Sequence, residues 1–132
     1  FNESRYPFVF RYNESTSSMF AACYDGSNFR SVSANGFPVN TWRQVVGVFD
    51  FVAGTLTLYR NGVSVGSTSI SGMTQVSNSS PVTIGSRLTT GGGYTSGIMY
   101  KGNVGIIRMY NKPLTAAEIL NNFNITKGTY GL

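Results

Sequence analysis

The sequence contains no histidine and a single cysteine, and this scarcity excludes several kinds of chemistry. Zinc sites and thiol–disulfide centres need several Cys or His side chains, which this chain cannot supply. One cysteine also rules out an internal disulfide. Cys23 lies in the apolar run 19–24, so we predict a small buried thiol and not a reactive one.

Charge is also scarce: charged residues make up 11% of the 132 residues, whereas about 25% is usual for a soluble domain. Ser, Thr, Asn and Gly supply the polarity instead, which suits short strands joined by tight turns. Ten Lys and Arg against five Asp and Glu give a net charge of +5. Because the basic residues are scattered, nucleic acid is not an expected partner. Weak attraction to anionic glycans or to a charged cell surface fits the charge better.

No apolar run approaches the roughly 20 residues that a membrane-spanning helix needs, so we expect no membrane insertion. No signal peptide is recognisable either. The chain starts at Phe1 without a methionine. We therefore interpret residues 1–132 as a single domain that is a C-terminal fragment of, or is cleaved from, a longer polypeptide.

Short runs of aromatic and β-branched residues, separated by turn signals, dominate the chain. Asn61-Gly62 is the strongest turn, because Asn-Gly accepts the positive φ angles of a type I′ hairpin, and Asp25-Gly26 is a second candidate. Evenly spaced strands of this kind favour an antiparallel sandwich or barrel. We expect strands at 6–12, 18–24, 29–34, 42–50, 55–60, 63–69 and 81–86, with a last pair within 98–110 that includes a buried strand at 104–110.

One amphipathic helix is predicted near the end of the chain. Thr115 and Glu118 have the spacing of a capping box, in which each side chain binds a backbone N–H of the other residue. Leu114 and Ile119 are placed to form a hydrophobic staple across this cap. The apolar face of the helix is predicted to consist of Ala116, Ile119, Leu120 and Phe123.

Four motifs in order resemble one family. They are 40–50, a Trp-led strand ending in Asp; 54–62, a "leu-tyr-x-asn-gly" hairpin; 81–85, a short strand ending in Ile-Gly; and 105–119, a strand followed by the capped helix. Together they resemble the concanavalin A-like, laminin-G-like jelly roll. The resemblance implies an all-β, antiparallel jelly-roll β-sandwich with one short C-terminal helix.

Two further features of the resemblance concern context. The tail 122–132 is similar to the ends of such domains in viral proteins, especially bacteriophage tail and virion proteins. Residues 1–39 match loosely, and the family's usual first strand, with its "val-x-x-trp" pattern, is not recognisable. A sandwich without that strand would expose a sheet edge. We expect the upstream part of the same chain, or a neighbouring subunit, to cover it.

The superfamily includes β-glucan hydrolases, which carry their acids as E-x-D-x-x-E on one strand. Here the acids are Glu3, Glu14, Asp25, Asp50 and Glu118, and none lies within six residues of another. Glycoside hydrolysis normally needs two carboxylates about 5–10 Å apart. Without such a pair, and without a histidine base, we expect no enzymatic activity.

The expected chemistry is therefore binding through loops at one rim of the sandwich. The candidate ligand-binding residues are Tyr24 and Asp25 in the first hairpin, and Arg87 and Tyr94 beside the glycine-rich segment 91–93. For each aromatic residue, packing in the core is the competing interpretation, and Trp42 is assigned to the core. We expect no cofactor. Laminin-G-like domains often hold calcium at a loop rim, and Asp25, Asn28 and Asp50 are the matching residues, although Asp25 and Asp50 also fit simple turns.

Taken together, the sequence predicts a non-enzymatic binding module for a cell-surface glycan or receptor. The setting implied by the resemblance is extracellular, on the virion surface, in a tail fibre or spike, as part of a homo-oligomeric assembly. The alternative is a structural or assembly module that docks onto neighbouring virion subunits.

Overall fold

The structure is a computed structural model that describes residues 7–79, 81–88 and 93–132. The chain divides into two compact units, each described here by itself. The first unit consists of Phe1–Ser77 with Tyr110–Leu132, and the second consists of Asn78–Met109. Among the described residues, no helix is both long and apolar enough to cross a membrane.

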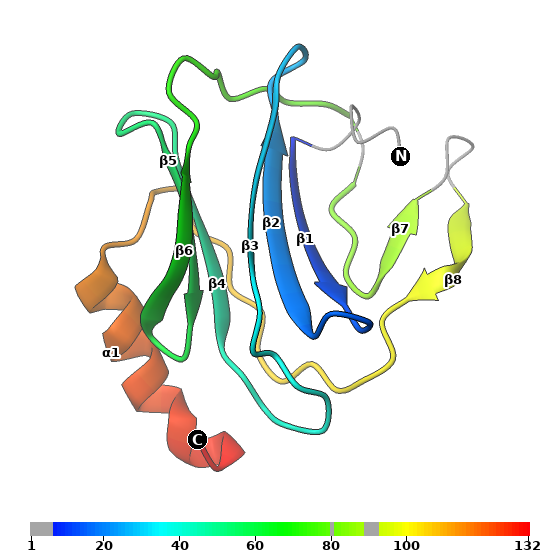
Figure 1. Ribbon diagram of the computed structural model, residues 1–132, viewed down its shortest axis with the longest axis vertical. Helices are drawn as coiled ribbons and strands as arrows, with labels where there is room; N and C mark the ends of the chain where they lie inside the picture. Colours follow the sequence, from blue (N-terminus) through cyan, green and yellow to red (C-terminus); the bar gives the residue numbers. More distant parts are fainter. Residues whose placement is uncertain (1–6, 80, 89–92) are drawn as a thin grey trace. The chain divides into compact units, whose positions relative to one another are not determined.

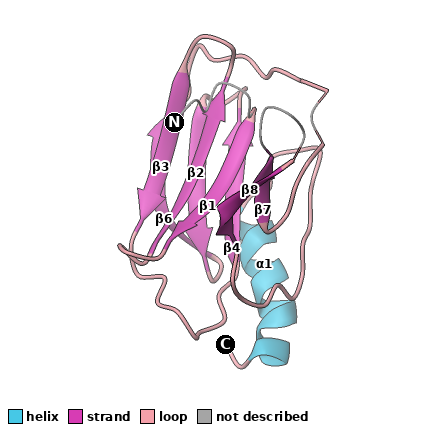
Figure 2. Ribbon diagram, turned by 90° about the vertical axis from the view of Figure 1, so that its right-hand side faces the viewer, coloured by secondary structure: helices cyan, strands magenta, loops and turns pink. Residues whose placement is uncertain are grey.

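The first unit contains two antiparallel sheets of three strands each (Figure 1). In each sheet the strands follow one another in chain order, as successive hairpins do. Figure 2 shows β3, β2 and β1 side by side in one layer. The first sheet comprises β1 (Phe8–Asn13), β2 (Ser18–Tyr24) and β3 (Phe29–Ala34), and the second comprises β4 (Val45–Asp50), β5 (Thr55–Arg60) and β6 (Val63–Ser69).

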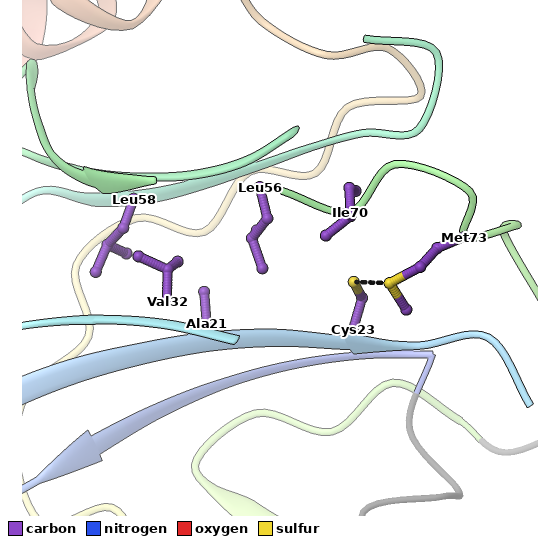
Figure 3. Close-up of a cluster of buried hydrophobic side chains, with 7 residues drawn as sticks. All are labelled: Ala21, Cys23, Val32, Leu56, Leu58, Ile70 and Met73. Carbon is purple, nitrogen blue, oxygen red and sulfur yellow. Dashed lines mark hydrogen bonds between the residues drawn. The ribbon is translucent and has the colours of Figure 1, made fainter. Parts of the chain in front are cut away.

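The core lies between these two sheets. Ala21 and Cys23 of β2 face Leu56 and Leu58 of β5, because alternate side chains of a strand point to the same side. Figure 3 shows the buried cluster, in which the Cys23 Sγ lies 3.9 Å from the Met73 Sδ. The buried residues of the cluster are Ala21, Cys23, Val32, Leu56, Leu58, Ile70 and Met73. The predicted burial of Cys23 is confirmed.

The C-terminal helix α1 (Ala116–Thr126) begins at the predicted capping box. Thr115 Oγ1 accepts the Glu118 N–H, and the Glu118 carboxylate accepts the Thr115 N–H. A 3-10 helix, η1 (Lys127–Tyr130), follows directly. Of the predicted apolar face, Ile119 is fully buried and Leu120 is about half exposed, whereas Ala116 lies in solvent. The helix packs on β6 and on the turn before it.

That contact depends on Gly62. Its φ is +80°, in the left-handed region, as the predicted type I′ turn requires. A Cβ at this position would lie 2.8 Å from Leu120 Cδ1 and 3.3 Å from Phe123 Cβ. The lack of a side chain therefore serves both the turn and the close approach of α1.

The second unit contains an antiparallel pair, β7 (Ser86–Leu88) and β8 (Tyr94–Met99). Two predictions for this part of the chain are wrong. Residues 81–85 form no strand, and the described segment 104–110 forms none either. Val104, Ile107 and Met109 are each half exposed or more, so the predicted burial is also wrong. An apolar pattern can propose a strand, but the strand exists only where another one pairs with it.

Trp42 is a third correction. The predicted strand 42–50 begins at Val45, and Trp42 lies in the preceding loop with 39% of its surface exposed, outside the core. The next residues explain the late start. The Gln44 N–H donates to Asn61 Oδ1 and the Gln44 side-chain oxygen accepts the Gly62 N–H, so the chain at this point binds a turn and not a strand.

The predicted fold class is confirmed. The chain is mostly β, with two antiparallel sheets packed around a common core and one short C-terminal helix, as in a jelly-roll sandwich.

Candidate functional site

The candidate sites of the first unit lie in the turns and loops at the two ends of its sandwich. The β2–β3 and β4–β5 turns lie at one end (Figure 1). The β1–β2, β3–β4 and β5–β6 connections lie at the opposite end. We call these the Asp25 end and the Trp42 end.

At the Asp25 end, the Asp25 carboxylate closes the β2–β3 turn. Its Oδ1 accepts the backbone N–H groups of Ser27 and Asn28 at 2.9 and 2.6 Å, and Oδ2 accepts the Asn28 side-chain amide at 3.2 Å. The hydrogen bonds from the Asn28 and Ser27 backbone, with a smaller one from Thr74, lower the pKa of the Asp25 carboxyl. The side chain thus acts as a turn former, with its charge directed at the protein's own N–H groups.

Tyr24, the neighbouring candidate, is half buried at the end of β2. Its hydroxyl donates to the Gly26 carbonyl, so it too stabilises the turn. Two aromatic residues that the sequence analysis did not select lie on the same outer face of the first sheet. Phe20 and Phe29 stack with ring centroids 6.2 Å apart, and the Arg11 guanidinium lies 5.0 Å from the Phe20 ring centroid.

Asp50 closes the β4–β5 turn in the same manner as Asp25. Its Oδ1 accepts the Val52 and Ala53 N–H groups at 3.1 and 2.8 Å. Among the described residues, no three His, Cys, Asp or Glu side chains come close enough to hold a metal ion. Calcium needs six to eight oxygen ligands that are free to point at the ion. The hydrogen bonds of Asp25, Asn28 and Asp50 are those of turn-forming residues.

The remaining two candidates belong to the second unit. Arg87 lies in β7 and is half buried, and Tyr94 begins β8 opposite Leu88. The Tyr94 side chain lies outside the described part of the structure, as do residues 91 and 92 of the glycine-rich segment. Tyr24 and Asp25 belong to the first unit, so the four candidates are divided between two separately described bodies.

At the Trp42 end, the β3–β4 connection is fixed at both ends. Phe37 is buried, its N–H donates to the Ser17 carbonyl at 2.9 Å, and its own carbonyl accepts the Tyr12 hydroxyl at 2.9 Å. The Arg60 guanidinium lies over the Phe37 ring, 5.3 Å from its centroid. Gln44 fixes the other end through its bonds to the β5–β6 turn. The intervening residues 38–43 therefore form a loop that is anchored at both ends.

Trp42 is the large aromatic side chain of this loop. Its ring packs against Tyr130 of η1, with centroids 4.7 Å apart and planes inclined by 47°. The sequence analysis missed this pair because the two residues are far apart in the chain. Two signals were available: Trp42 is the single tryptophan, and Tyr130 follows the predicted helix without belonging to its apolar face.

Each residue of the aromatic pair has a cationic residue close to it in the chain. Arg43 follows Trp42 directly, and its guanidinium donates to the Trp42 carbonyl at 2.7 Å. Lys127 begins η1, and its ammonium lies 5.7 Å from the Phe123 ring centroid. Residues three apart in a 3-10 helix eclipse one another, so Lys127 and Tyr130 project from the same side of η1.

Comparison with known families identifies the one to which this chain belongs. The chain belongs to the concanavalin A-like lectin/glucanases superfamily, whose laminin-G model matches residues 2–120. The match therefore also includes most of residues 1–39, which the sequence analysis found only loosely similar. No curated protein matches the chain.

Among solved structures, an S-layer domain-containing protein from Clostridium thermocellum (residues 221–444) is similar at a TM-score of 0.54 and 18% identity. The likeness covers 87% of this chain and 61% of that one, so the chain spans about three-fifths of that structure. At this identity the likeness supports the fold. The resemblance to the superfamily predicted from the sequence is thus confirmed.

Proposed function

We propose that this domain is a non-catalytic binding module that recognises carbohydrate outside the cell. Membership of a lectin and glucanase superfamily leaves two broad functions, sugar binding and sugar hydrolysis. A binding module is the function that the fold fits. The positions of the carboxylates argue against hydrolysis.

The observation that carries the proposal is the placement of three carboxylates. Asp25 and Asp50 each close their own turn, and Glu118 caps α1 and pairs with Lys112. A glycosidase needs one carboxyl as acid and a second as nucleophile or base on opposite sides of the scissile bond. Carboxylates that are held by backbone N–H groups in three separate elements are poorly suited to that work.

The test is a glycan array probed with the isolated domain, together with an assay for reducing ends released from β-glucans. We expect binding to a subset of glycans and no release of reducing ends. Turnover that disappears in Asp25→Asn or Asp50→Asn would show that the protein is an enzyme. An array without any bound glycan would contradict carbohydrate recognition.

We further propose a location on the surface of a virion, as in a tail fibre or spike. The support is the resemblance of residues 122–132 to the ends of viral domains of this kind. The similar solved structure is that of a bacterial S-layer domain-containing protein, which offers a cell surface as the alternative setting. Immunogold labelling with antibodies against the domain distinguishes the two, because label on cell walls and not on particles would contradict the virion.

A second candidate function is assembly, in which the domain docks onto a neighbouring subunit. Among the described strands of the two sheets, β1, β3, β4 and β6 each have one hydrogen-bonded neighbour, and Phe8 of β1 contacts Phe49 of β4. Phe8 and Phe10 point toward the core from β1, yet they remain 45% and 40% exposed. An apolar rim beside open strand edges suits docking. Light scattering tests it: a strictly monomeric domain that does not bind its parent polypeptide would argue against assembly.

A further inference from the structure

Trp42 is a large apolar side chain of the first unit that is partly exposed and also packed against a second aromatic ring. A tryptophan that served the core alone would be buried, as Leu56 and Leu58 are. Here the ring is packed on one side by Tyr130 and is 39% exposed. Aromatic rings that present a rigid apolar face next to polar groups are the usual partners of the apolar face of a sugar ring.

The loop that carries Trp42 is held before any ligand arrives. Phe37 is anchored by the Ser17 and Tyr12 contacts, and Gln44 is anchored by three hydrogen bonds to the Asn61-Gly62 turn. Between these anchors, Asn40 adopts a left-handed φ of 61°, a conformation that Asn tolerates. A site on such a frame loses little conformational entropy on binding, which favours affinity.

The charges around the platform are predominantly positive. The Arg43 guanidinium binds the Trp42 carbonyl, Lys127 begins the 3-10 helix that carries Tyr130, and Arg60 lies at the same end over Phe37. Among the four described acids, Asp25 and Asp50 close turns at the opposite end and Glu118 pairs with Lys112. Glu14, in the β1–β2 turn, is the described acid at the Trp42 end. The excess of cations favours a ligand with negative charge.

We propose that Trp42 and Tyr130 form the stacking platform of a saccharide site, and that Arg43 and Lys127 select sugars bearing carboxylate or sulfate groups. The planar guanidinium of Arg43 matches either anion in a two-bonded geometry. This inference depends on the proposed function and moves the site away from the β2–β3 turn and the second unit, where the sequence placed it. Under this proposal, part of the net charge of +5 serves to bind an acidic ligand.

Because Trp42 is the single tryptophan, its fluorescence reports on this site alone. We would titrate the domain with a heparin tetrasaccharide, a hyaluronan tetrasaccharide and uncharged cellotetraose. We expect a saturable change in emission with the two acidic sugars and an affinity about tenfold lower for cellotetraose. Binding of the acidic sugars should weaken as NaCl is raised, since salt screens the charges.

Variants test where the sugar binds. Their affinities are measured by calorimetry, because variants of Trp42 lack the fluorescence signal. Trp42→Ala should lower the affinity about tenfold or more, whereas Trp42→Phe should retain part of it because a ring remains. Arg43→Gln and Lys127→Gln should reduce the preference for acidic over neutral sugars. Arg30→Gln is the matched control, because this exposed arginine also donates to the carbonyl of the preceding aromatic residue, but at the Asp25 end. Thermal unfolding of each variant checks that the fold is intact.

The outcomes separate the two proposals. Glycan binding that Trp42→Ala leaves unchanged would overturn this site while the proposed function stands. Equal affinity for cellotetraose and the acidic sugars would overturn the role of Arg43 and Lys127. If no array glycan and no tetrasaccharide binds, the proposed function fails, and the Trp42–Tyr130 pair serves only to fasten η1 to the β3–β4 loop.

Discussion

Gly54 shows how a single residue can be required for two separate reasons. Its φ of +67° lies in the left-handed region, where a side chain costs about 1–2 kcal/mol. A Cβ at this position would also lie 3.0 Å from the Ser71 Cα, which is backbone and cannot swing away. The Gly54 carbonyl accepts the Ile70 N–H, so displacement of this turn disturbs the core beside it.

We therefore expect Gly54→Ala to be clearly more destabilising than Gly72→Ala. Gly72 has a similar φ of +79°, but among the described residues nothing would contact its added Cβ. The control should cost about 1–2 kcal/mol, and Gly54→Ala about 1–3 kcal/mol more because of the steric overlap. Urea unfolding followed by circular dichroism measures both. Equal losses would mean that the Ser71 backbone moves aside without cost.

Glu118 links the stability of α1 to pH. Hydrogen bonds from the Lys112 ammonium and the Thr115 N–H lower the pKa of this carboxyl from 4.5 to about 2. Because the folded pKa is lowered, the stabilisation is fully present above about pH 4.5 and is lost as the pH falls toward 2. Glu118→Gln should therefore be less stable than the wild type at pH 7, with a difference that closes near pH 2.

Chemical unfolding at pH 7, 4 and 2 measures this difference directly. Thr115→Ala serves as the comparison, because it removes the hydroxyl acceptor of the same cap and should cost about 1 kcal/mol. Its effect should vary less with pH than that of Glu118→Gln. A Glu118→Gln deficit that is as large at pH 2 as at pH 7 would contradict the assignment.

At the scale of elements, the turn between β5 and β6 also forms the surface on which helix α1 packs. Gly62→Ala would meet both a left-handed φ and the Leu120 side chain at 2.8 Å. We expect a loss of stability of about 2 kcal/mol or more, and weaker helical ellipticity if α1 separates from the hairpin. Gly128→Ala is the control: among the described residues nothing contacts its added Cβ, so it should be neutral or slightly stabilising.

The elements also show what sequence reasoning can reach. The strands on either side of Asn61-Gly62 have the predicted bounds, since the turn chemistry fixes the register locally. The cap of α1 was equally predictable from Thr115 and Glu118. The structure of the segment 104–110 could not be predicted in this way, because an apolar pattern does not indicate whether another strand pairs with it.

The candidate site was harder to predict than the fold. Asp25 lies in the predicted turn, but its contacts to the backbone, which make it a turn former, depend on loop geometry that the pattern does not encode. The sequence places Trp42 in the core because it begins the predicted strand 42–50. Its actual partner, Tyr130, comes from the far end of the chain, and such a pairing is a property of the folded molecule.

At the scale of the whole first unit, one small core holds the two sheets together. Leu58 is fully buried between them, whereas Leu120 on α1 is about half exposed. We expect Leu58→Ala to cost about 2–5 kcal/mol, and Leu120→Ala clearly less. Denaturant unfolding of both variants tests whether the core is placed correctly. A smaller loss for Leu58→Ala than for Leu120→Ala would contradict it.

Cys23 offers a probe of global opening. The thiol is buried, and burial raises its pKa, so both access and thiolate formation are suppressed in the folded state. We expect the reaction with Ellman's reagent at pH 8 to be at least about a hundredfold slower than in urea. The rate in the native state should increase in Leu58→Ala. Rapid labelling of the native protein would show that the sheets separate readily.

The first unit is assembled from two stretches of chain, 1–77 and 110–132, with the second unit between them. On a ribosome, all six strands of the sandwich emerge before the residues that seat α1 on the β5–β6 turn and Tyr130 on Trp42. The nascent sandwich must therefore wait with that end uncovered until translation has passed residue 130. For that interval the Trp42 ring lacks its Tyr130 contact and exposes more apolar surface, which chaperones recognise.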